Sequence, residues 1–180
     1  MKQKLIFSTL ILAGSLTLVG CASNADINQM TSANKPVEQV RNHNLVNNIA
    51  VEQVIGGKET NPLWTSQINN TNFKEALIRS LKIANLYQDV SGAKYKLDAN
   101  LIKLGQPLFG FNLTVDCQVH YSLLDVQSNR KIFDKDITTS YTAKLNDSLY
   151  APARLKIANE GAARKNIQEF IKEIYQLPRR

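Results

Sequence analysis

A long run of alternating residues in the second half of the chain constrains the fold most. Between residues 112 and 126, every second position carries a side chain suited to a core: Leu113, Val115, Cys117, Val119, Tyr121 and Leu123. The positions between them are polar: Thr114, Asp116, Gln118, His120 and Ser122. Successive side chains of a strand point to opposite faces of its sheet. The alternation therefore predicts a strand with one buried and one wet face, which is typical of antiparallel sheets.

Three further segments complete the predicted sheet. Residues 94–104 and 130–143 alternate in the same way, and Ser128 and Asn129 predict a tight turn before the second of them. Residues 45–55 predict an earlier strand, because an apolar run ends there at two glycines. The core faces of 94–104 and 130–143 are predicted to contain Tyr95, Leu97, Ala99, Leu101, Ile137, Thr139 and Tyr141.

Two segments have helical periodicity instead. The first runs to Asn85 from a cap at Thr71 or Asn72, with Glu75 completing a capping box after Asn72. Its apolar face consists of Phe73, Ala76, Leu77, Leu81 and Ala84. Every third or fourth position along a helix lies on the same face, so this segment predicts an amphipathic helix.

The second predicted helix covers residues 148–176 and closes the chain. Asp147 or Ser148 is the predicted cap. Glu160 and Arg164 have the spacing of a surface ion pair, and Gly161 indicates close packing on the sheet.

The order of these elements predicts an α+β fold. It consists of a four-stranded, mainly antiparallel sheet with two helices packed on one face, because that arrangement buries both amphipathic stripes. The chain has 180 residues, of which 43% are hydrophobic and 21% charged. This composition is typical of a globular protein, and we expect a single domain over residues 45–178.

The N-terminus has the pattern of an export signal. A basic segment at residues 1–4 precedes an apolar run at 5–19, which is shorter than the ~20 residues of a membrane-spanning helix. The run ends in Leu18-Val19-Gly20-Cys21, which resembles the lipobox of bacterial lipoproteins. This resemblance implies that residues 1–20 are cleaved and that Cys21 is acylated on its sulfur and its new amino group. The alternative is an ordinary secretory signal with a chance cysteine.

The residues after Cys21 predict the location of the protein. In such lipoproteins, an aspartate directly after the cysteine causes retention at the inner membrane, whereas Ala22 and Ser23 follow here. The resemblance therefore implies anchorage at the outer membrane with the domain in the periplasm. The polar stretch at 21–44 predicts a flexible tether behind the anchor.

The sequence contains no convincing catalytic or metal-binding motif. Cys117 and His120 are three residues apart on one strand, so their side chains point to opposite faces. The only histidines are His43 and His120, and no zinc-site spacing is present. The strand carboxylates Asp98, Asp116, Asp134 and Asp136 are interpreted as solvated charges. We therefore expect no enzyme activity, no cofactor and no metal.

The net charge of +7 permits anionic partners. Nucleic acid is not expected, because the basic residues are scattered and an exported chain rarely meets it.

Two loops are candidate contact sites. Residues 105–111 form an apolar connection in which Leu108, Phe109 and Phe111 are predicted either to make an exposed tip or to pack beneath the helices. Trp64 lies in a polar loop and is predicted either to anchor a partner or to pack over the first helix.

The layout resembles small outer-membrane lipoproteins of Gram-negative bacteria. Segments Gln-Pro-Leu-Phe-Gly at 106–110 and Ala-Asn-Glu-Gly-Ala-Ala at 158–163 are similar to those of uncharacterised proteobacterial lipoproteins. This resemblance implies a non-enzymatic module that binds a protein of an envelope complex, through an edge strand or the Phe109 loop. The alternative is a lipid- or glycan-binding carrier, which requires an apolar pocket with basic residues at its mouth.

Overall fold

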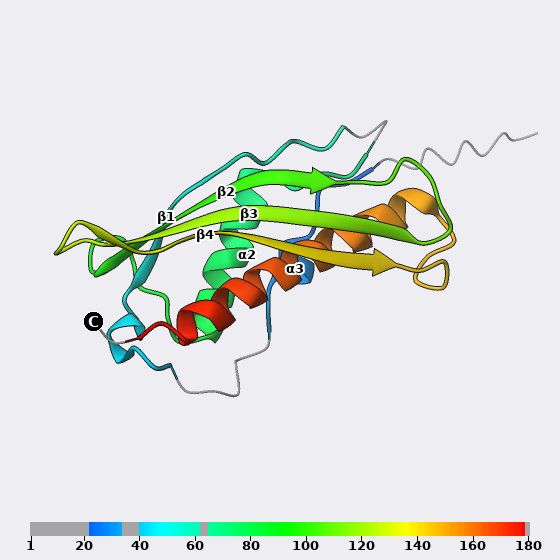
Figure 1. Cartoon of the computed structure of the whole chain (residues 1–180). Helices are drawn as coiled ribbons and strands as arrows, with labels where there is room; N and C mark the ends of the chain where they lie inside the picture. The colour runs from blue at the N-terminus through cyan, green and yellow to red at the C-terminus, as the bar shows by residue number, and fades with distance from the viewer. Residues whose placement is uncertain (1–21, 34–39, 62–64, 179–180) are drawn as a thin grey trace, which may run out of the picture.

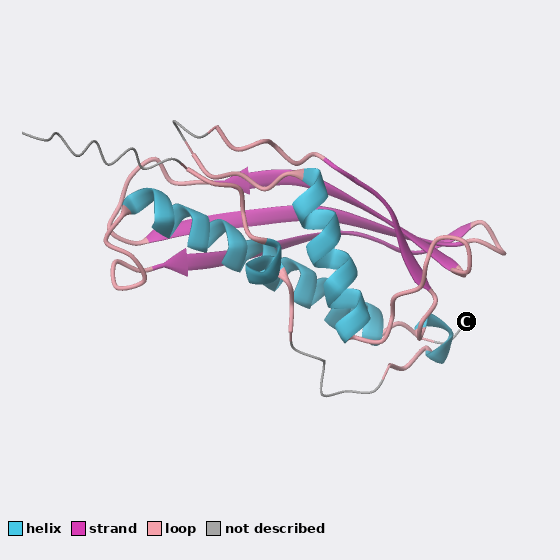
Figure 2. Cartoon of the chain, turned by 180° about the vertical axis from the view of Figure 1, so that it is seen from behind, coloured by secondary structure: helices cyan, strands magenta, loops and turns pink. Residues whose placement is uncertain are grey.

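The computed structural model describes residues 22–33, 40–61 and 65–178 as a two-layer α+β fold. Helices α2 and α3 lie on one face of a four-stranded sheet, whose other face no helix covers (Figures 1 and 2). In chain order the elements are α1 (Ile27–Met30), a 3-10 turn (His43–Leu45), β1 (Ile49–Ile55), α2 (Asn70–Ile83), β2 (Tyr95–Gly105), β3 (Leu113–Asp125), β4 (Arg130–Ala143) and α3 (Ala151–Tyr175). The predicted fold class is confirmed.

The strands lie in the sheet in their chain order, β1-β2-β3-β4. β1 pairs in parallel with β2, because the chain crosses over through α2 between them. The other two pairs are antiparallel, with Ala99 opposite Tyr121 in one and Val119 opposite Ile137 in the other. The predicted turn between β3 and β4 is present, with Asn129 at a φ of 52°.

The alternation along β3 sorts its side chains as predicted. All six predicted core residues of β3 are buried, and Tyr121 stacks on Phe170 of α3 with ring centroids 4.2 Å apart. Phe133 meets the same ring edge-on at 5.6 Å. An aromatic cluster of this kind stabilises a core beyond its buried area, so it fixes α3 against β3 and β4.

Two residues of α3 determine how closely it approaches the sheet. Asn166 is fully buried, and its side-chain amide donates to the carbonyl oxygens of Cys117 (3.0 Å) and Ile137 (2.8 Å). It also accepts a hydrogen bond from the Tyr121 hydroxyl at 2.9 Å. Gly161 faces the Tyr141 ring so closely that a Cβ would overlap it. The predicted close packing at Gly161 is thus confirmed.

Several predicted element boundaries are wrong by about one turn. The cap of α2 is Asn69, which accepts from the Asn72 amide, so Asn72 lies inside the helix. Helix α3 begins after Tyr150 without a side-chain cap. Asp147 instead accepts from the Lys144 amide and shapes the preceding loop. In both cases a residue capable of capping occurs near the helix start, but only α2 has a side-chain cap.

The segment predicted as a flexible tether, 22–44, is packed on the domain wherever the structure describes it. Ala25 and Met30 are buried, and Asp26 caps α1. The Asp26 amide donates to Glu160 of α3 at 2.7 Å. The polar composition predicted a tether because its few apolar residues show no periodicity.

The predicted surface pair of Glu160 and Arg164 is also corrected. Glu160 is buried and pairs with Lys156 at 3.0 Å, while Arg164 donates to the Gln29 carbonyl. Both side chains therefore bind the N-terminal segment, Glu160 through the Asp26 amide and Arg164 through the Gln29 carbonyl.

We predict that Gly161→Ala lowers the free energy of unfolding by about 1 kcal/mol. The gain in helix propensity, up to ~1 kcal/mol, is outweighed by ~1–3 kcal/mol from overlap with Tyr141. Urea unfolding measures the change. The same substitution in a Tyr141→Leu background is the control, where less overlap remains and the loss should shrink or reverse. A stabilising effect in the otherwise unchanged chain would contradict the close packing.

The Cys117 thiol should be unreactive in the folded protein. Burial raises its pKa to about 12 from a usual value of 9.0, so almost no thiolate forms at neutral pH. Maleimide should label Cys117 only after denaturation, as a mass spectrum of intact protein would show. Because the fold favours the neutral thiol, its contribution to stability is complete below about pH 9 and is lost as the pH rises toward 12. Rapid labelling of native protein at pH 7 would show that this part of the core is open.

Candidate functional site

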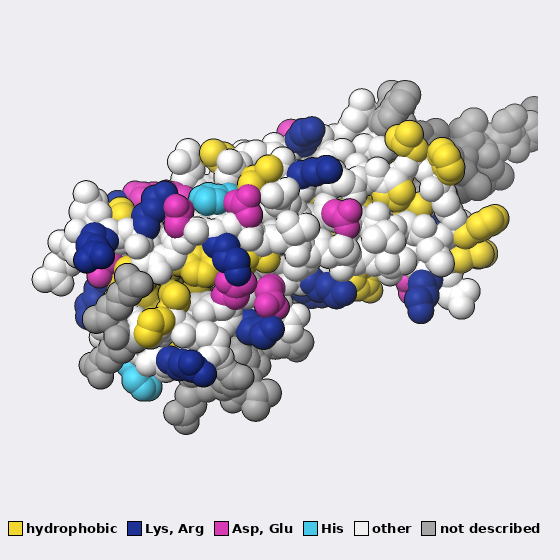
Figure 3. Space-filling view, viewed as in Figure 1, with side chains coloured by type: hydrophobic (Ala, Val, Ile, Leu, Met, Phe, Trp, Pro, Cys, Tyr) yellow, Lys and Arg dark blue, Asp and Glu magenta, His cyan; other side chains and the backbone are white. Residues whose placement is uncertain are grey.

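The most unusual surface of the described chain is an apolar tip at one end of the sheet. Leu108, Phe109 and Phe111, in the connection between β2 and β3, are 96%, 87% and 79% exposed. Leu149 and Tyr150, in the connection between β4 and α3, are 85% and 49% exposed. Figure 3 shows hydrophobic side chains projecting at this end. We call these five residues the apolar tip; of the two alternatives for the Phe109 loop, the structure has the exposed one.

Arg154 holds the two loops of the tip together. Its guanidinium is buried at the start of α3 and donates to the carbonyl oxygens of Ser148 (2.7 Å) and Leu149 (2.9 Å). A longer bond of 3.4 Å reaches the carbonyl of Gly110 in the other loop. A guanidinium carries several donors in a fixed plane, so one side chain can join separate backbone segments. Arg154 thus links the connection between β4 and α3 to the Phe109 loop at the base of the tip.

A cluster of amide and hydroxyl side chains joins the base of the tip to the N-terminal segment. The Gln106 side chain donates to the Ser66 carbonyl (2.8 Å) and to Asn159 of α3 (2.9 Å). The Ser66 hydroxyl donates to the carbonyl of Ser23 at 2.9 Å. Ala25 donates its amide to the Gln67 carbonyl at 3.2 Å. The first described residues of the chain therefore lie beside the loop that carries Phe109.

Behind the tip lies a cavity of about 610 Å³, within the usual size range of small-molecule sites. We call it the end cavity. The end of β2, the Phe109 loop and the first turn of α3 supply its apolar lining. The apolar side chains among its lining residues are Ile68, Leu101, Ile102, Leu104, Pro107, Leu108, Phe109, Leu113, Ala151, Pro152 and Leu155.

A β-bulge opens β2 at this cavity. The register between β2 and β3 shifts between Leu101 and Lys103, so Ile102 has no partner opposite it. Both Ile102 and Lys103 are consequently exposed and line the cavity, which breaks the alternation followed by the rest of the strand. Bulges redirect side chains in this way beside binding sites.

The end cavity combines an apolar lining with positive charge. Lys58 and Lys103 are its charged lining residues. An apolar lining with a few placed polar groups is the usual character of a ligand site. This arrangement suits an apolar group that carries a negative charge near one end.

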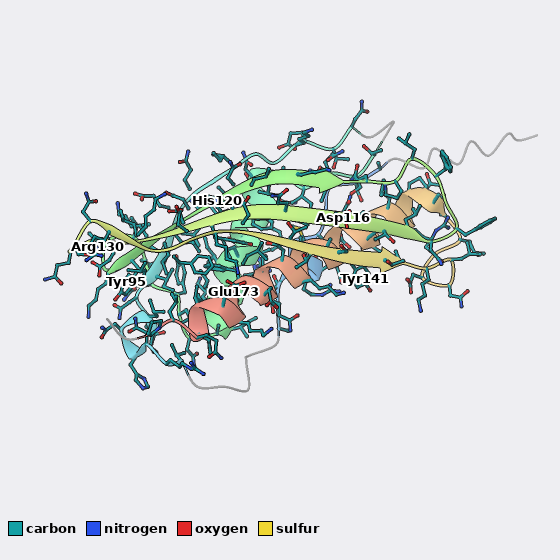
Figure 4. The ribbon with its side chains drawn as sticks, viewed as in Figure 1. Tyr95, Asp116, His120, Arg130, Tyr141 and Glu173 are labelled. Carbon is teal, nitrogen blue, oxygen red and sulfur yellow. The ribbon has the colours of Figure 1, made fainter. Side chains whose placement is uncertain are left out.

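A second polar cluster lies on the outer face of the sheet. His120 joins two carboxylates of β4 across the strands, with its Nδ1 2.6 Å from Asp136 and its Nε2 3.1 Å from Asp134. A hydrogen bond from Lys131 and the positive charge of that side chain lower the pKa of Asp134. Figure 4 shows His120 and Asp116 along β3. These exposed cross-strand contacts stabilise the sheet modestly and enclose no substrate-sized space.

The other predicted site residues are placed as follows. Cys21 and Trp64 lie outside the described residues. Cys117 is buried in the core whereas His120 lies half-buried on the outer face of the sheet, so the prediction that their side chains point to opposite faces is confirmed. Within the described ranges, no three His, Cys, Asp or Glu side chains form a group that could hold a metal ion. No helix in those ranges is long and apolar enough to cross a membrane.

Several residues of this end were not predicted from the sequence. Leu149 and Tyr150 were absorbed into the start of the predicted last helix, although two apolar residues before Pro152 break its polar capping pattern. The sequence did not indicate that Arg154 would be buried, since an arginine in the first turn of a helix is ordinarily solvated. The bulge at Ile102 follows from pairing with β3 and not from local sequence.

Comparisons with known proteins establish a shared fold. No protein-family model matches the chain, and no curated protein matches its sequence. Protein XCC0632 from Xanthomonas campestris, described as DUF330, is 12% identical with a TM-score of 0.54, over 78% of this chain and 92% of that chain. Protein CT253 from Chlamydia trachomatis is 10% identical with a TM-score of 0.53, over 72% and 95%. A minor lipoprotein from Acinetobacter baumannii is 10% identical with a TM-score of 0.47, over 75% and 98%.

We predict that the end cavity binds an anionic apolar dye such as anilinonaphthalene sulfonate. Lys103→Glu and Lys58→Glu should each weaken binding about threefold, as expected for one partly screened charge contact. Lys94→Glu, an exposed lysine at the other end of β2, is the matched control and should have no effect. Fluorescence titration at low salt measures the affinities. Equal weakening by all three variants would place the dye elsewhere.

Proposed function

We propose that this protein is a non-enzymatic lipoprotein of the cell envelope, anchored through lipid on Cys21, that binds a partner protein in its end cavity. The domain lies in the periplasm, and the anchor lies in the outer membrane. The partner belongs to an envelope complex and contributes a short apolar segment with an acidic group. The protein thus acts as an accessory that holds the partner close to the membrane.

The observation that carries the proposal is the end cavity with its apolar lining and two lysines, Lys58 and Lys103. Beside the bulge, Ile102 and Lys103 place an apolar and a basic side chain in the lining, which suits an apolar segment with an acidic group. The pattern ending in Cys21 supports the anchor. The described residues that line the cavity are apolar or amide side chains, two lysines, Thr65 and glycines, a set suited to binding.

A second candidate function is a lipid- or glycan-binding carrier. The cavity volume and its two lysines equally suit a single acyl chain with an anionic head group. This candidate differs from the first in its ligand and not in its site, so one experiment separates them.

Photo-crosslinking from the cavity tests the proposal in intact cells. A photo-reactive amino acid replaces Ile102, which lines the cavity and is half exposed. The matched control replaces His120 on the outer face of the same sheet. We expect a discrete protein adduct from position 102 and none from position 120. Metabolic labelling with a palmitate analogue, compared with Cys21→Ala, checks the anchor separately.

The outcomes divide the candidates. A lipid adduct at position 102 without a protein adduct would support the lipid-binding carrier and contradict the protein-binding module. No adduct of either kind at position 102 would overturn the proposed binding site.

A further inference from the structure

The apolar tip is more exposed than binding in the end cavity requires. Only Leu108 and Phe109 of its five residues line that cavity, whereas Phe111, Leu149 and Tyr150 do not. The side chains of Leu149 and Phe111 are largely exposed to solvent. Exposed aromatic and aliphatic side chains gathered in two loops are the feature by which peripheral proteins enter the boundary of a lipid layer.

The N-terminal segment directs this tip toward a membrane. Ser23 is hydrogen-bonded to Ser66, which in turn accepts from Gln106 at the base of the Phe109 loop. Asn24 accepts from the amide of Thr60 at 3.3 Å, in the same part of the molecule. Figure 1 shows the first described residues, in dark blue, approaching the end of the sheet that carries the tip. A lipid attached directly before Ala22 therefore brings the bilayer to this end.

Exposed lysines lie around the tip. Lys58, Lys103 and Lys144 are in the loops and strand ends at this end of the molecule, together with the acidic Glu59, Asp116 and Asp147. Each lysine near an anionic lipid surface adds to the attraction of the apolar side chains. At the other end of the sheet, the exposed apolar residues are Val90 and Val126, which are smaller and do not form an aromatic cluster.

We infer that the apolar tip inserts into the membrane that holds the anchor, with Phe109 and Phe111 at the boundary between head groups and acyl chains. The ligand is a phospholipid surface. This inference rests on the proposed anchorage at Cys21 and adds a second membrane contact to it. The lipid on Cys21 attaches the protein to the membrane, and a second contact through the tip fixes its orientation.

The first test uses vesicles and the chain from Ala22 to Arg180, which contains the entire described fold and no anchor. Vesicles of phosphatidylethanolamine and phosphatidylglycerol should bind it, and Phe109→Ser with Phe111→Ser should reduce the bound fraction about tenfold. The matched control, Val90→Ser with Val126→Ser, removes exposed apolar side chains from the opposite end and should leave binding unchanged. Equal binding by the tip variant and the parent chain would overturn the inference.

The second test uses the full lipidated protein reconstituted in the same vesicles. Phe109→Cys or Val126→Cys carries an environment-sensitive fluorophore, and buried Cys117 stays unlabelled in the native state. We expect a blue-shifted probe at 109 that is shielded from aqueous iodide, and a quenched probe at 126. Equal quenching at both positions, in protein that floats with the vesicles, would show that the tip faces water. Protein that fails to float at all would instead refute the anchor at Cys21.

A protein-only contact is a further outcome. If the probe at 109 stays accessible on vesicles and position 109 gives a discrete protein adduct in cells, the tip binds a protein and the membrane inference is wrong.

Discussion

The seating of α3 on the sheet is the constraint on which the rest of the molecule depends. Asn166 satisfies carbonyl oxygens of two strands at once, and Gly161 lets the helix approach the Tyr141 ring. A buried amide with all its partners in place permits one position of the helix, because any shift leaves polar atoms unpaired. Its first turns then carry Arg154, Asn159 and Glu160 to fixed places. These three side chains hold the tip loops, the Phe109 loop base and the N-terminal segment.

Sequence periodicity predicted the sheet and its core because period two along a strand is a direct consequence of backbone geometry. The face of β3 from Leu113 to Leu123 could be assigned residue by residue for that reason. The exposure of Leu108, Phe109 and Phe111 was one of two open alternatives. Local sequence could not decide between them, since the bonds at the base of this loop, from Gln106 to Ser66 and Asn159, join residues 40 and 53 positions apart in the chain.

For the N-terminal segment, the prediction from the sequence was wrong. A stretch rich in Asn, Ser and Gln was interpreted as a tether, yet Ala25 and Met30 fill gaps between the helices. Two apolar side chains are too few to produce periodicity, and the partner that stabilises them, Glu160, looked like part of an exposed helix face. The fold shared with bacterial proteins of 10–12% identity predicts none of these contacts, because function resides in loops that a common fold does not fix.

The packed N-terminal segment limits how far the domain could move from a membrane that held an anchor at Cys21. A flexible linker of about twenty residues would let the domain move over tens of ångströms from its anchor. Because residues 22–33 are packed on the helices, the length of the sheet sets the distance between the anchored end of the domain and its other end. The thirteen residues of β3 span about 40 Å at ~3.3 Å each. With an anchor at Cys21, the turn at Ser128 and Asn129 would then lie at a fixed distance of about one strand length from the membrane, so the domain would act as a rigid spacer.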